Sequence, residues 1–164
     1  MRKTTISAKI SIFNQIAYKT VPLTTATQPD SAIRVDDKLI LFGEDDPDDE
    51  ELLKEVFASV DEKFSLLFVS TGKKLISTLE TMPSDQLPCL IVLDYNMPEL
   101  NGAEILEALR HRQLCDSIPK VVWSTSGSEK FRSSCLELGA EEYFIKPSTL
   151  SGLTEIARRM LAFC

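Results

Sequence analysis

Five polar side chains lie at or just after the ends of short apolar runs: Asp45, Asp46, Asp94, Ser124 and Lys146. Carboxylates that crowd together raise one another's pKa values unless a counter-charge offsets them. Mg²⁺ is a natural counter-charge, because hard divalent cations bind carboxylate oxygens. The lysine adds a fixed positive charge, and the serine adds a hydroxyl donor. Together these groups suit a phosphoryl group held on Asp94, with that carboxylate as the nucleophile.

The apolar runs must bring these groups together. The run 90–93 is short, wholly apolar and bounded by turn residues, which predicts a strand buried on both faces. Four further strands are predicted at 39–42, 64–69, 120–124 and 142–145. Helical spacing of apolar residues separates them, so the pattern predicts five βα units around a parallel sheet. The leading candidate is the α/β flavodoxin-like (βα)5 fold, doubly wound, with strand order 2-1-3-4-5.

The predicted position of the site follows from this strand order. Strand one lies beside strand three, so Asp45 and Asp46 are expected next to Asp94 at the carboxyl edge of the sheet, where ligands bind in such folds. The acids at 48–51 are expected on the solvated first turn of a helix, where the macrodipole favours them. A last helix is predicted from Thr149 to about Phe163.

Composition narrows the class of protein. The 164 residues carry a net charge of −7, and residues 37–164 alone carry −10, which disfavours nonspecific binding to nucleic acid. No apolar run is long enough to cross a bilayer. The cysteines Cys89, Cys115, Cys135 and Cys164 are widely spaced without a C-x-x-C pair, and we expect four reduced thiols in a cytoplasmic protein.

The first 36 residues differ from the rest. They are rich in serine and threonine and hold five basic against two acidic side chains. We expect a flexible N-terminal extension over 1–36, with a docking arm or a transit peptide as less favoured interpretations, and a folded domain over 37–164. A signal peptide is not predicted, because polar residues interrupt any apolar core.

Residues 38–164 resemble a response-regulator receiver domain of two-component signalling, of the single-domain CheY-like type. The resemblance rests on GEDD at 43–46, DYNMP at 94–98 with Gly102 eight residues after Asp94, a hydroxyl after PKVVW at 119–123, and YFIKP at 143–147. Each motif alone is weak, but all of them in order, each at a strand end, are specific.

The resemblance implies a role for each matching residue. Asp94 would accept a phosphoryl group from a histidine kinase, and Lys146 would contact that group. Mg²⁺ would be bound by Asp45, Asp46 and Asp94 and by the backbone carbonyl of Asn96. Ser124 would move toward the phosphoryl group, and Tyr143 would turn inward. Ser124 stands where threonine is more usual in the family, which leaves the lifetime of the phosphoryl group open.

The resemblance also implies partners. These are a sensor histidine kinase or a histidine phosphotransfer protein, and a downstream effector bound by the face that 129–138, 142–145 and 149–163 form. We expect a stand-alone regulator, since no output domain follows, with homodimerisation left open. It would be no enzyme beyond its own phosphorylation and dephosphorylation.

Alternatives to this interpretation remain. The first is a relay intermediate that passes phosphate to a histidine phosphotransfer protein. The second is a receiver-like binding module that is never phosphorylated. The third is an aspartate-nucleophile phosphatase, which commonly needs a second acid two residues after the nucleophile, whereas position 96 is Asn.

Overall fold

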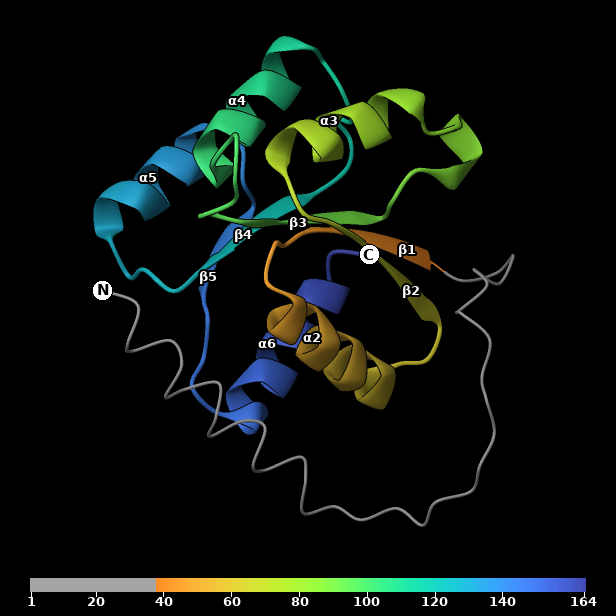
Figure 1. The fold of residues 1–164 in the computed structure, drawn as a ribbon, viewed down its shortest axis with the longest axis vertical. Helices are drawn as coiled ribbons and strands as arrows, with labels where there is room; N and C mark the ends of the chain where they lie inside the picture. Colours follow the sequence, from red (N-terminus) through yellow and green to blue (C-terminus); the bar gives the residue numbers. More distant parts are fainter. Residues whose placement is uncertain (1–37) are drawn as a thin grey trace.

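A computed structural model describes residues 38–164, so the predictions for 1–36 lie outside the described residues. Five strands form one parallel sheet in the order β2-β1-β3-β4-β5 (Figure 1), which confirms the predicted fold class and strand order. The elements run in the order β1 (Lys38–Gly43), α2 (Pro47–Val60), β2 (Phe64–Val69), α3 (Gly72–Thr81), the 3₁₀ turn η1 (Ser84–Gln86), β3 (Leu90–Asp94), α4 (Gly102–His111), β4 (Lys120–Ser124), α5 (Glu129–Glu137), β5 (Glu142–Ile145) and α6 (Leu150–Leu161).

The sheet separates two apolar cores. Helices α3, α4 and α5 cover one face, and α2 and α6 cover the other (Figure 1). Strand β3 lies in the middle, and every one of its residues is buried. Its alternating side chains supply both cores, Ile91 and Leu93 to one and Leu90 and Val92 to the other. Because each fully buried side chain of this kind contributes roughly 1.5–3 kcal/mol, β3 is firmly held between the two helical layers.

Local signals determine where several helices begin and end. Asn101 and Glu104 form a reciprocal capping box at the start of α4. Thr71 and Thr149 cap α3 and α6 with their hydroxyl oxygens. Gly139 follows α5 with φ of +99°, a conformation that glycine adopts without strain. Gly139 therefore allows the chain to turn away directly after the end of α5.

The prediction of four reduced cysteines is wrong. Cys89 and Cys164 form a disulfide with their Cα atoms 5.1 Å apart, while Cys115 and Cys135 are free thiols. The two partners are 75 residues apart in sequence. The fold brings them together because Cys89 directly precedes β3 and Cys164 follows α6. Their spacing alone carries no signal of this pairing.

No helix in the described part of the chain is both long and apolar enough to span a membrane.

Candidate functional site

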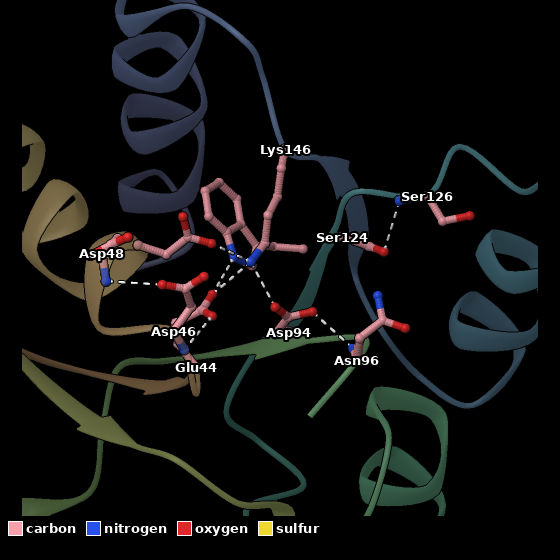
Figure 2. Close-up of polar contacts among 10 residues, drawn as sticks. Glu44, Asp46, Asp48, Asp94, Asn96, Ser124, Ser126 and Lys146 are labelled. Atoms are coloured by element: carbon pink, nitrogen blue, oxygen red, sulfur yellow. Dashed lines mark hydrogen bonds and ion pairs between the residues drawn. The ribbon is translucent and has the colours of Figure 1, made fainter. Parts of the chain in front are cut away.

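Asp94 ends β3 at the carboxyl edge of the sheet. It is 6% exposed, and both of its carboxylate oxygens accept hydrogen bonds (Figure 2). Oδ1 accepts from the backbone N–H of Asn96 at 2.8 Å, and Oδ2 accepts from Nζ of Lys146 at 2.6 Å. Burial beside a lysine that pairs with it places this carboxylate where a nucleophile could react out of bulk water.

Lys146 follows β5 and points across the sheet edge toward the other acids. Its Nζ also contacts Glu44 Oε2 at 2.7 Å and Asp49 Oδ2 at 2.8 Å, so one ammonium serves three carboxylates. Burial acts to lower the pKa of Lys146, but the charges of Glu44, Asp94 and Asp49 outweigh it and hold that pKa above its usual value. Lys146 is therefore a permanent cation within the site.

Glu44 is a central residue that the sequence did not single out. It is 2% exposed, and its Oε2 also accepts from the indole nitrogen of Trp123 at 3.0 Å. Burial raises the pKa of Glu44 from 4.5 to about 7, with the positive charge of Lys146 opposing the shift and the negative charge of Asp94 adding to it. Strand register explains this position: Gly43 pairs with Leu93, so the next residues on the two strands are Glu44 and Asp94.

Three carboxylates form a cluster that could hold a metal ion. One oxygen from each of Glu44, Asp45 and Asp94 lies within 4.8 Å of the others. Burial raises the pKa of Asp45, and the neighbouring charge of Asp94 raises it further. The donor set is all oxygen, which suits a hard cation such as Mg²⁺. A bound cation would also improve the charge balance, because the single positive charge of Lys146 is shared by three carboxylates.

Asp46 occupies a different position from the one predicted. Its side chain accepts from the backbone N–H of Asp48 at 3.0 Å and caps the N-terminus of α2 (Figure 2). The carboxylate cluster contains Glu44 where the sequence predicted Asp46. Counting from the true end of β1 would have found this, because the acid immediately after Gly43 is Glu44.

Asp49 differs from the expectation of a solvated acid. It lies in the first turn of α2 but is 8% exposed and contacts Lys146. The prediction that all the acids at 48–51 form a solvated face is therefore wrong for this residue. Asp49 precedes the buried Leu52 and Leu53 by about one helical turn, so the three residues share the inner face of α2.

Ser124 and Tyr143 lie on the adjacent strands β4 and β5. Ser124 is fully buried, and its hydroxyl oxygen accepts from the backbone N–H of Ser126 at 3.1 Å. Tyr143 is also buried, and its hydroxyl donates to the backbone oxygen of Ser126 at 3.0 Å. The loop after β4 is thus bonded at Ser126 to both predicted switch residues. At the same end of the two strands, the backbone N–H of Lys146 donates to the carbonyl of Ser124 at 2.7 Å.

The structure therefore assembles most of the predicted set. It brings Asp45, Asp94 and Lys146 together and adds Glu44 and Asp49. Ser124 ends β4, the strand next to β3. Asn96 is tied to Asp94 through its backbone N–H.

Comparison with known proteins gives a consistent result. The model of the response regulator receiver domain matches residues 40–158. The two-component response regulator ORR11 of Oryza sativa subsp. indica is 31% identical over 116 residues, which cover 70% of this chain and 77% of that protein. The response regulator ORR7 of Oryza sativa subsp. japonica is 32% identical over 99 residues, which cover 60% of this chain but only 46% of ORR7.

Solved structures show the same relationship. The phosphorylated cyanobacterial phytochrome response regulator RcpA is 29% identical with a TM-score of 0.67, covering 77% of this chain and 93% of RcpA. The Mn²⁺-bound form of response regulator Rcp1 is 29% identical with a TM-score of 0.64 and the same coverage. From its strand order, its cluster of acids around Lys146 and these matches, the chain belongs to the response regulator receiver domain family of two-component signalling.

Proposed function

We propose that the protein is a response regulator that accepts a phosphoryl group on Asp94 from a histidine kinase. The observation that carries this proposal is the setting of Asp94: a buried carboxylate at a strand end, paired with Lys146 and clustered with Glu44 and Asp45. A carboxylate oxygen would attack the phosphorus, the phosphorus–nitrogen bond of the donor phosphohistidine would break, and an acyl phosphate would form. The similarity to RcpA, a regulator solved in a phosphorylated form, supports it.

The proposed metal is Mg²⁺, held by Glu44, Asp45 and Asp94 and by the backbone carbonyl of Asn96. Bound there, Mg²⁺ would neutralise charge on the phosphoryl oxygens and lower the cost of bringing an anion to this acidic pocket. Lys146 would supply the second positive charge, moving from its contacts with Glu44 and Asp49 toward the phosphoryl group. Similarity to Rcp1, which has been solved with Mn²⁺ bound, supports a divalent cation at this edge.

The proposed signal is a rearrangement of the loop after β4. Ser124 would give up its hydrogen bond from Ser126 and donate its own hydroxyl hydrogen to the phosphoryl group. Because Tyr143 is bonded to the same residue, movement of Ser126 would change how Tyr143 is held. Ser124 and Tyr143 would thus form a two-state element biased by a local charge.

The proposed output surface is the face formed by α5, β5 and α6. Two apolar side chains lie exposed there, Ile145 at 51% and Leu136 at 38%. Exposed apolar side chains next to a switch residue suit a protein partner that senses the switch. We propose that a downstream protein binds here in the cytoplasm, and that the domain is a signalling acceptor with no turnover of external substrates.

Incubation with Mg²⁺ and acetyl phosphate, followed by intact-mass measurement, tests the core of the proposal. We expect a gain of one phosphoryl group in the native protein and none in Asp94→Asn. Asp48→Asn is the matched control, because Asp48 is an exposed acid at the start of α2 and outside the carboxylate cluster. A native protein that gains no mass, or an Asp94→Asn variant that still gains it, would overturn the assignment of Asp94.

A further inference from the structure

The disulfide joins the residue before β3 to the residues that follow α6. Cys89 directly precedes β3, and its backbone N–H donates to the carbonyl of Leu39 on β1 at 2.8 Å. Cys164 lies beyond α6, and its carbonyl accepts from Nζ of Lys38 at 2.8 Å. The bond therefore fastens the end of α6, a helix of the proposed output face, to the amino edge of the sheet.

Helix α6 has a separate attachment to the core. Leu153, Ala157 and Met160 are buried to 1% exposure or less and pack against the sheet. The turn after the helix is held by backbone bonds from Ala162, Phe163 and Cys164 to carbonyls at the end of α6, and by the bond from Lys38 to Cys164. Phe163 and Cys164 are only partly buried against the core, in contrast to the buried face of α6, so loss of the disulfide would loosen this turn while leaving most of α6 packed.

The two sulfur-bearing residues are also within reach of solvent. Cys89 and Cys164 are both partly exposed, whereas the free Cys135 is fully buried in the other core. A disulfide at a partly exposed edge can be approached by a thiol without unfolding of the domain. A fully enclosed disulfide could not be.

We propose that Cys89–Cys164 is a redox-active disulfide that a dithiol opens reversibly, releasing the turn after α6. A thiolate of the dithiol attacks one sulfur, the Cys89–Cys164 bond breaks, and a mixed disulfide forms. The second thiol of the reductant then displaces the remaining sulfur. In total two electrons and two protons pass to the protein, and the dithiol becomes a disulfide.

This assignment rests in one respect on the proposed function. In the cytoplasm, where we propose that the domain acts, disulfides are usually redox-sensing or catalytic because the compartment keeps structural thiols reduced. Oxidation state would then set the mobility of one end of the output helix. The phosphoacceptor would be spared, because Asp94 stands at the opposite end of β3, about 16 Å from Cys89 at roughly 3.3 Å per residue.

Thiol counting tests the bond directly. The full chain, purified without reductant and denatured in N-ethylmaleimide, should take up two maleimide groups, on Cys115 and Cys135. After treatment of the native protein with dithiothreitol and removal of the reductant, it should take up four, and oxidised glutathione should return the count to two. The control Cys115→Ser should lower each count by one and leave the change between states at two.

Amide hydrogen exchange tests the release. On reduction, the amides of 162–164 should lose their protection, while those of β3 should keep it. Cys89→Ser should show the unprotected pattern with or without dithiothreitol. Uptake of four maleimide groups before reduction would show that the disulfide is absent. Uptake of only two after treatment of the native protein with dithiothreitol would show that the bond is not open to reduction, which would overturn the redox role. Unchanged exchange at 162–164 would overturn the release. Acetyl phosphate uptake, measured in both redox forms, reports on Asp94 independently, so failure of phosphorylation leaves the redox result standing.

Discussion

The indole nitrogen of Trp123 donates to the same carboxylate oxygen of Glu44 that Lys146 contacts, at 3.0 and 2.7 Å. The ammonium of Lys146 also lies 4.8 Å from the centre of the Trp123 ring. The indole therefore contacts both Glu44 and Lys146 at the edge of the proposed metal pocket. Trp123 is the only tryptophan in the sequence, so its fluorescence reports on this site alone.

Titration with Mg²⁺ should change the emission of Trp123. A cation drawn to Glu44 alters the charge on the oxygen that accepts the indole hydrogen bond, and the emission follows the local field. In Glu44→Gln the Mg²⁺ concentration at half-change should rise about tenfold, the scale seen when a group that supports a metal site is removed. Asp48→Asn should titrate like the native protein. A Glu44→Gln variant with native Mg²⁺ affinity would show that Glu44 takes no part.

Substitutions at Asp45 and Asp46 should separate a metal ligand from a helix cap. Asp46→Ala should lower the free energy of unfolding by about 1 kcal/mol through loss of the cap on α2, and Asp46→Asn should restore it. Both variants should bind Mg²⁺ nearly as the native protein does. Asp45→Asn should show the reverse, with weakened Mg²⁺ binding and near-native stability. Urea unfolding and Mg²⁺ titration measure the two effects. If substitution of Asp46 weakened Mg²⁺ binding as much as substitution of Asp45, Asp46 would be a metal ligand.

Removal of the ammonium of Lys146 should destabilise the domain strongly. Lys146→Met leaves Glu44, Asp49 and Asp94 without their shared cation, and breaking a buried ion pair from one side costs about 3–5 kcal/mol. Urea unfolding gives the value. Lys73→Met is the control, because the exposed pair of Lys73 with Glu99 is worth roughly 1 kcal/mol or less. If Lys146→Met cost no more than this control, the three contacts would carry little net stability.

Loss of the disulfide should lower the free energy of unfolding by about 4 kcal/mol in oxidising buffer, because the bond closes a long loop in the unfolded chain. The loop joins residues 75 apart, and Cys164→Ser opens it. Urea unfolding of the two proteins should differ without reductant and converge with dithiothreitol. A difference that persisted under reducing conditions would trace the effect to packing around Cys164.

The thiol of Cys135 should react slowly even in mild alkali. Burial raises the pKa of Cys135 from 9.0 to about 11, so the reactive thiolate is scarce at pH 8. The labelling rate of native Cys135 with iodoacetamide should keep rising up to about pH 11, behind that of the partly exposed Cys115. The unfolded thiol ionises first, near pH 9, so the stabilising contribution of this group is full below pH 9 and is lost as pH rises toward 11. A labelling rate that levelled off near pH 9 would contradict the raised pKa.

Sequence patterns predicted the architecture because they report local and periodic properties. The wholly apolar run 90–93, short and bounded by turn residues, is typical of a strand covered on both faces, and a residue at the end of such a strand lies at the sheet edge. Lys146 was found in the same way, as the polar residue that follows β5. Once the strand order was predicted, it followed that the residues at these strand ends lie together at one edge of the sheet.

The missed features depend on register and distant contacts. Whether Glu44 or Asp46 faces Asp94 is decided by the residue at which β1 ends, and a shift of two positions exchanges a buried carboxylate beside Asp94 for a helix cap. The burial of Asp49 depends on which side of α2 it occupies. The pairing of Cys89 with Cys164 depends on the fold alone, since neither neighbourhood in the sequence marks it.

The Cys89–Cys164 bond also gives the domain a covalent topology. It turns residues 89–164 into a ring that holds β3, β4 and β5, while β1 and β2 belong to a linear tail. The exposed stretch around η1 lies in that tail, just outside the ring. A protease cut there divides the oxidised molecule into two pieces, whereas a cut within the ring leaves one covalent molecule.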